Sequence, residues 1–193
     1  MSTNQIDEEV KLQLIKLTSE DSITRFWASD KLVKIAHIAS EEVKLQAIKE
    51  MILSFEVEDP PTNDRIIWAL GNLGETALAE LKKFIESETG KIRELSIYSV
   101  GRYISHPIIR LNTLKGLLQH EEKEVRIIAS SSLNNFAQNI GQKYQTGIIT
   151  KEYKEIKLEL ISILEKNLKS EELKIEQFTE QALNWLKKKK EKG

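Results

Sequence analysis

The stretch "RIIWALGNLGETALAEL", residues 65–81, decides how the rest of the chain is interpreted. An apolar helical pattern runs to Gly71, is interrupted at Asn72-Leu73-Gly74, and then resumes as a second helix. A glycine inside a helix costs about 1 kcal/mol relative to alanine. Two glycines in so short a span therefore either form a loop that binds a phosphate group or mark close packing and a turn between helices.

The residues around these glycines favour the packing interpretation. A phosphate-binding loop needs a β-strand before its glycines and usually a Lys-Ser or Lys-Thr pair after them. Here a helical pattern precedes them, and Glu75 follows. Without a Cβ, Gly71 and Gly101 allow neighbouring helices to approach closely, and Gly74 suits a helix end where φ is positive. We therefore predict two packing contacts and one turn.

The composition predicts an all-α protein. The chain has 193 residues, of which 40% are hydrophobic and 31% are charged, with only three prolines and eight glycines. Apolar residues recur with helical spacing in three segments before residue 56, and the connection expected to be longest is 141–150. Short turns make successive helices antiparallel. Further helices are predicted over 62–73, 75–87, 91–104, 107–119, 122–139, 151–168 and 171–189.

Alternate helices share a pattern of residue types. Each begins near an arginine, continues with a small residue and then a large apolar residue, although Arg65 lies two positions later than its counterparts. The arginines are Arg25, Arg65, Arg93 and Arg126, followed by Ala28, Ala69, Ser96 and Ala129, and then by Leu32, Leu70, Val100 and Leu133. Three of these arginines allow two interpretations, a ladder that binds nucleic acid and a structural ladder of pairs with acids in the preceding turns, of which we expect the second. These pairs are Arg25 with Asp21, Arg93 with Glu88, and Arg126 with Glu122.

The two-helix unit resembles the HEAT repeat, in its short bacterial form related to the phycobilisome-lyase-type repeat. The segments that carry the resemblance are "WALGNLG" (68–74), "ALAELKKFI" (77–85), "YSVGRYI" (98–104) and "EEKEVRIIASSSL" (121–133). The match is best over residues 62–140, and the last helix pair, 151–189, fits a C-terminal cap. The resemblance implies one domain over residues 1–193, a right-handed α-solenoid of about five antiparallel helix pairs.

The resemblance also implies a binding surface. In HEAT repeats the second helix of each pair lines the concave face, and two positions one turn apart on these helices point away from the core. The residues at these positions in the best-matched helices include Trp68, Asn72, Tyr98, Arg102 and Asn135. Tryptophan, tyrosine and arginine are enriched at interaction hot spots. The alternative left open is that Trp68 and Tyr98 are buried between repeats.

The sequence offers little for catalysis. There is no cysteine, and the three histidines, His37, His106 and His120, fall at separate helix ends rather than at metal-ligand spacing. Acidic residues at 7–9, 41–42 and 121–122 are interpreted as first-turn residues that complement the helix dipole. We therefore expect no catalytic residue, no metal and no cofactor.

These patterns predict a non-enzymatic scaffold that binds a protein or peptide partner on its concave face. The net charge of −1 argues against nucleic acid, and no uncharged apolar run is long enough to cross a membrane. We expect a cytoplasmic monomer. One alternative is a nucleic-acid-binding HEAT-like protein related to DNA glycosylases, and a weaker one is a bilin lyase or isomerase, suggested by the name of the repeat alone.

Overall fold

The computed structural model describes residues 2–57, 59–102, 106–147, 150–168, 170 and 172–187. Within these ranges the chain forms ten α-helices, two short 3₁₀ helices and no strand, which confirms the predicted all-α class. The helices fall into two compact units, residues 1–99 (unit 1) and residues 100–193 (unit 2), and each is described by itself. The prediction of a single domain over residues 1–193 stays a prediction.

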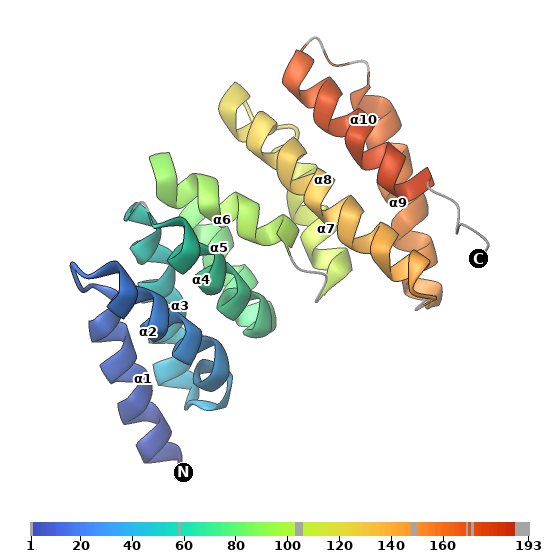
Figure 1. Cartoon of the computed structure of the whole chain (residues 1–193). Helices are drawn as coiled ribbons and strands as arrows, with labels where there is room; N and C mark the ends of the chain where they lie inside the picture. The colour runs from blue at the N-terminus through green and yellow to red at the C-terminus, as the bar shows by residue number, and fades with distance from the viewer. Residues whose placement is uncertain are drawn as a thin grey trace. The chain divides into compact units, whose positions relative to one another are not determined.

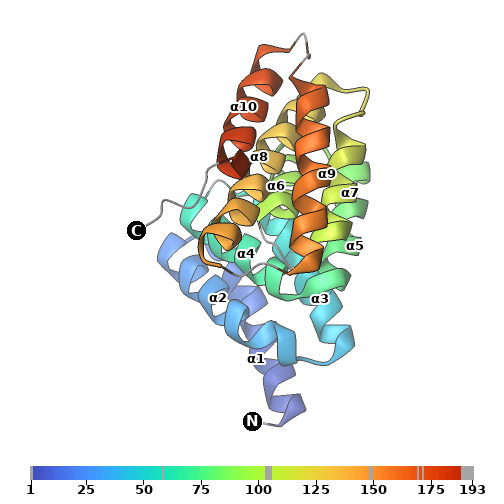
Figure 2. The same cartoon turned by 90° about the vertical axis from the view of Figure 1, so that its right-hand side faces the viewer.

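Unit 1 is built from helix pairs in two layers. Helices α1, α3 and α5 pack side by side in one layer, while α2 packs against α4 in the other and against its partner α1 (Figures 1 and 2). The helices are α1 (Thr3–Leu17), α2 (Ser22–Ile35), α3 (Glu41–Leu53), α4 (Pro60–Asn72), α5 (Gly74–Ser87) and most of α6 (Gly90–Arg102), with 3₁₀ turns at Ala36–Ile38 and Ser54–Glu56. Buried residues between the layers include Val10, Leu32, Ile48, Met51, Phe55, Ile66, Leu70 and Leu78.

Unit 2 repeats this arrangement. Helix α7 packs against α9 in one layer and α8 packs closely against α10 in the other, with α7 on α8 and α9 on α10. These helices are α7 (Pro107–Leu117), α8 (Lys123–Gln145), α9 (Lys151–Asn167) and α10 (Leu173–Lys187). Side chains buried here include Leu111, Leu114, Leu133, Phe136, Leu160 and Leu186. Each unit is thus a stack of antiparallel helix pairs, the repeating arrangement of an α-solenoid.

Two helices are longer than predicted, α4 at its start and α8 at its end. Helix α4 begins at Pro60, because prolines at the first two helical positions lose no intrahelical hydrogen bond. Helix α8 continues to Gln145, so the predicted connection over 141–150 is wrong for its first half. Gly141 is buried, and a Cβ there would lie 2.8 Å from the carbonyl oxygen of Trp185 on α10. Because Gly141 has no Cβ, α10 can pack closely against α8 at this point, and this packing offsets the low helix propensity of glycine.

The glycines singled out in the sequence behave as packing and turn residues. Gly74 has φ of 66°, the positive value predicted for a helix junction. A Cβ on Gly101 would collide with the backbone of Ser132 on α8, lying 2.6 Å from its carbonyl carbon, so the predicted close approach is confirmed there. Gly71 is buried in α4, and its role as a contact point stays a prediction.

The first acidic group departs from its predicted role. Helix α1 begins at Thr3 behind a capping box formed by Ser2 and Gln5, so residues 7–9 lie beyond its first turn. The carboxylate of Asp7 instead accepts a hydrogen bond of 2.8 Å from the backbone N–H of Ser40, the N-cap of α3. Residues 41–42 do occupy the first turn of α3. Residues 121–122 precede α8, whose first turn carries a different glutamate.

The arginine ladder exists, but its acids come from a later helix than predicted. The Nη2 of Arg25 lies 2.8 Å from the carboxylate of Asp59, which precedes α4, whereas Asp21 caps its own helix by accepting from the backbone of Thr24. The Nη1 of Arg25 also donates to the carbonyl oxygen of Ser19. The ladder therefore joins α2 to the next helix of the same layer.

The same geometry recurs in unit 2. Arg126 pairs with Glu172 ahead of α10, not with the predicted Glu122, and donates to the carbonyl oxygen of His120. In α6, the Nε of Arg93 donates to the main-chain carbonyl oxygen of Glu88. The prediction paired each arginine with an acid in the turn before its own helix. The side chains of Arg25 and Arg126 instead reach an acid at the start of the next helix in the same layer.

Candidate partner-binding surface

Trp68 lies on the outer face of α4, with 41% of its surface exposed. This exposure excludes the alternative left open by the sequence for Trp68 alone, because a tryptophan packed between repeats would be buried. Tyr98 on α6 is half-buried, so it is neither fully enclosed nor freely presented. The outward phase assigned to α4 is therefore correct, whereas binding by Trp68 stays a prediction.

The other three predicted residues are distributed over both units. Asn72 is exposed at the last position of α4, one turn after Trp68. Arg102 is exposed at the end of α6, where its carbonyl oxygen accepts from Asn139, and Asn135 is half-buried on α8. Arg102 and Asn135 belong to unit 2 and the rest to unit 1. A groove shared by all five residues accordingly stays a prediction.

Around Trp68 the structure assembles a surface that the sequence did not reveal. The guanidinium carbon of Arg65 lies 5.5 Å from the ring centroid of Phe26 on α2 and 5.6 Å from that of Trp68. The Phe26 ring in turn meets Trp27 edge-to-face, with centroids 5.5 Å apart, and Trp27 is 63% exposed. These four residues, together with Asp30, are called the aromatic–arginine cluster.

Local helix geometry explains why these side chains meet. Phe26 and Asp30 are one turn apart on α2, and Arg65 and Trp68 are about one turn apart on α4, so each pair shares a helix face. Because α2 and α4 are packed neighbours, the two faces adjoin. A guanidinium within about 6 Å of an aromatic ring centroid is stabilised by cation–π attraction.

The shifted position of Arg65 releases it from the ladder. Asn63 takes the ladder position in α4, and its Nδ2 donates to the carbonyl oxygen of Val57, six residues earlier. The Nη1 of Arg25 makes the corresponding bond to Ser19, also six residues earlier. Two residues further along α4, Arg65 projects toward the aromatic rings instead. The imperfect register of the repeat was thus the sequence signal for this cluster.

The charges within the cluster are unequal. Asp30 forms an ion pair of 2.7 Å with Lys34 on its own helix, and one of its oxygens lies 3.8 Å from Arg65. At that distance the Arg65 contact is an ion pair without a hydrogen bond. Two cations therefore face a single carboxylate, so these three groups together carry one positive charge in excess.

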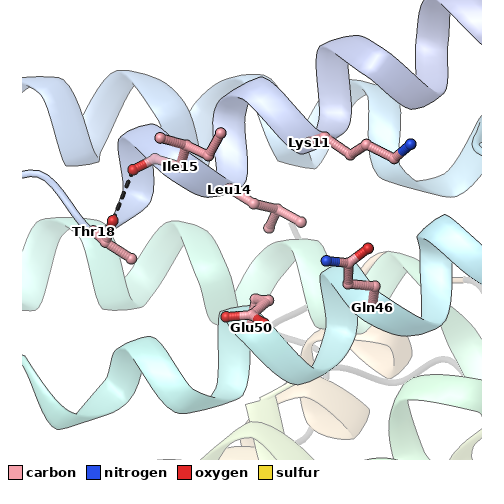
Figure 3. Close-up of a pocket in the computed structure, with 6 residues that line it drawn as sticks. All are labelled: Lys11, Leu14, Ile15, Thr18, Gln46 and Glu50. Carbon is pink, nitrogen blue, oxygen red and sulfur yellow. Dashed lines mark hydrogen bonds between the residues drawn. The ribbon is translucent and has the colours of Figure 1, made fainter.

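A second surface feature of unit 1 is a hollow of about 410 Å³ between α1 and α3. Figure 3 shows Leu14 pointing from α1 toward α3, which contributes Gln46 and Glu50 to the opposite wall. Lys11, Ile15 and Thr18 complete the lining, and the hydroxyl of Thr18 donates to the carbonyl oxygen of Ile15. One lysine, one glutamate and aliphatic walls form no nucleophile–base pair, so we assign no chemistry to this hollow.

The histidines lie at helix ends, as predicted. His37 is in the 3₁₀ turn after α2, His106 precedes α7 with φ of 52°, and His120 precedes α8, where its Nδ1 accepts from the backbone N–H of Glu122. Across the described part of the chain, no group of three or more metal-ligating side chains comes together. Nor does any helix in the described ranges combine the length and hydrophobicity needed to cross a bilayer.

Comparison with known proteins gives structural neighbours only. No family model matches the chain, and no curated protein matches it. One engineered protein of known crystal structure aligns at a TM-score of 0.40 and 18% identity, covering 96% of this chain, which spans about half (48%) of that longer protein. A designed armadillo repeat protein aligns at a TM-score of 0.36 and 16% identity, covering 92% of this chain and 99% of the design. The assignment of the fold rests on the helices themselves.

Proposed function

We propose that the protein is a non-enzymatic scaffold that binds a protein or peptide partner through the outward faces of its second helices. The observation that carries this proposal is the exposure of Trp27 and Trp68 beside Arg65 on the adjoining faces of α2 and α4. Tryptophan and arginine are the residue types most enriched at binding hot spots. Two large aromatic side chains left in water on neighbouring helices favour a partner that covers them.

The HEAT-type repeat belongs to this proposal. The paired helices, the close contact at Gly101 and the forward ladders from Arg25 and Arg126 support it. If the array has the curvature of HEAT proteins, the second helices line its concave side, and the predicted binding residues beyond Trp68 extend the surface. These residues are Asn72, Tyr98, Arg102 and Asn135.

Nucleic acid is the weaker candidate for the partner. Exposed aromatic residues and arginine also suit stacking on bases. However, tight binding to phosphates needs many cations, and the two cations in contact at the aromatic–arginine cluster, Arg65 and Lys34, already face Asp30. The formal net charge of the chain is −1. No observation supports bilin lyase activity.

The test begins with the unmodified chain as bait in affinity capture from the native host, followed by mass spectrometry. The captured partner is then titrated against Trp68→Ala and against Lys82→Ala, a truncation of an exposed residue on α5. We expect Trp68→Ala to weaken binding by about 2 kcal/mol or more and Lys82→Ala to have little effect. Equal affinities for both variants would refute the role of this face.

Stability measurements on the same variants separate binding from folding. A fully buried tryptophan costs about 3–5 kcal/mol of stability when truncated to alanine. Because Trp68 is 41% exposed, its loss should cost clearly less, and the helical content measured by circular dichroism should be preserved. A Trp68→Ala chain that unfolds would show that this side chain supports the core instead of a partner.

A further inference from the structure

We propose that the aromatic–arginine cluster binds an acidic peptide, in which an Asp or Glu carboxylate pairs with Arg65 and adjacent apolar side chains cover Trp27 and Trp68. This inference rests on the proposed function and names the chemistry of the partner. It depends on three properties of unit 1: the unused hydrogen-bond donors of the Arg65 guanidinium, the charges of the side chains in contact with it, and the row of aromatic rings on either side of it.

Arg65 is held in place without using its hydrogen-bond donors. Its guanidinium is near the rings of both Phe26 and Trp68, and its side chain is 36% exposed. Its one ion pair among the described residues, at 3.8 Å from Asp30, is too long for a hydrogen bond, and its guanidinium donates no hydrogen bond to any other described residue. An arginine held by cation–π contacts retains the planar fork of N–H groups that matches a carboxylate. Binding to it therefore requires little additional ordering of the side chain.

The local charge favours an incoming carboxylate. Asp30 lies closer to Lys34, at 2.7 Å, than to Arg65, at 3.8 Å. The three groups in contact, Arg65, Lys34 and Asp30, therefore carry one positive charge in excess, which a single carboxylate neutralises. A polyanion such as nucleic acid would also bring several phosphates close to Asp30. Charge complementarity thus points to a peptide with an isolated acidic residue.

The aromatic surface extends on both sides of the cation. Trp27 meets Phe26 edge-to-face, Phe26 lies beside Arg65, and Arg65 lies beside Trp68, which makes a continuous row from α2 to α4. Trp27 and Trp68 are the exposed ends of this row. A peptide that places its carboxylate on Arg65 would therefore position its neighbouring residues over an indole ring. Apolar or aromatic residues are the ones that such a ring favours.

The experiment selects peptides from a random phage-displayed library on the full chain, and then measures synthetic copies of selected sequences by fluorescence polarisation. We expect these sequences to carry Asp or Glu flanked by apolar residues. Replacing the acid with its amide should weaken binding by about tenfold or more, because a charge-assisted pair is lost. The Arg65→Gln variant should weaken binding of the acidic peptide to a similar degree and should no longer distinguish acid from amide.

Two further variants identify the geometry. Arg65→Lys keeps the charge but loses the planar fork that binds a carboxylate through two N–H groups, so it should recover little of the affinity. Asp30→Asn removes the internal competing carboxylate and should tighten binding of the acidic peptide. Lys82→Gln removes a positive charge from α5 and serves as the control for net charge; it should change affinity little.

Each contrary result has a separate meaning. Selected peptides whose binding ignores Arg65→Gln and the acid-to-amide change would overturn this proposal while leaving the proposed binding function in place. Failure to select any peptide would also overturn it. The proposed binding of a protein partner would then be tested by the affinity capture alone. A labelled single-stranded oligonucleotide that binds more tightly than every peptide, in an Arg65-dependent manner, would replace the acidic peptide with nucleic acid.

Discussion

Replacing Gly101 with alanine provides a quantitative test of the close contact between α6 and α8. The added Cβ would lie 2.6 Å from the carbonyl carbon and 2.9 Å from the Cα of Ser132, whereas ordinary contacts begin at 3.4 Å. The backbone at Gly101 would have to move away from Ser132 by at least about 0.8 Å, the difference between 3.4 and 2.6 Å, because the opposing atoms are backbone atoms that cannot rotate away. Overpacking of this kind costs about 1–3 kcal/mol, and the better helix propensity of alanine returns at most about 1 kcal/mol. We expect a net destabilisation of about 1–2 kcal/mol.

Gly116 on α7 is the matched control. A Cβ at this exposed helical position would meet nothing within 4 Å, so Gly116→Ala should stabilise the chain by up to about 1 kcal/mol. Both variants are unfolded with urea and followed by circular dichroism at 222 nm, a wavelength at which signal is roughly proportional to helix content. If Gly101→Ala is as stable as the unmodified chain, the two helices do not meet as closely as described, and the packing argument fails.

Three further predictions concern the arginine ladder, the hydrogen bond from Ser40 to Asp7, and the binding of nucleic acid. Arg25→Ala removes the partner of Asp59 and should lower the free energy of unfolding by about 1.5–3 kcal/mol in urea titrations; no loss would contradict the ladder. The backbone N–H of Ser40 lowers the pKa of Asp7, so this contact stabilises the fold above about pH 4 and is lost as the pH falls through the lower folded pKa. The difference in melting temperature between the unmodified chain and Asp7→Ala should accordingly shrink below about pH 4, and a constant difference would refute this. Fluorescence titration with duplex DNA should show no tight, salt-sensitive binding, and a submicromolar affinity near physiological salt would overturn that expectation.

The sequence by itself determined the helices, their pairing and several turns. The all-α class, the positive φ at Gly74 and the close approach at Gly101 all follow from patterns within a few turns of one helix. Helical periodicity is a local property, since residues three or four apart share a face whatever the helix packs against. The outward phase of Trp68 could be read for the same reason.

Only the tertiary structure decided which residues from different helices meet. The contact of Arg65 with Phe26 depends on how far α4 is shifted along α2. The late position of Arg65 in its repeat signals that it leaves the ladder, but it does not identify the rings that Arg65 meets. The pairing of Arg25 with Asp59 and the extension of α8 past Gly141 depend likewise on neighbouring helices distant in sequence. Propensities and capping act over one or two turns, whereas these contacts are set by the packing of whole helices, and tertiary packing outweighs local preference where the two differ.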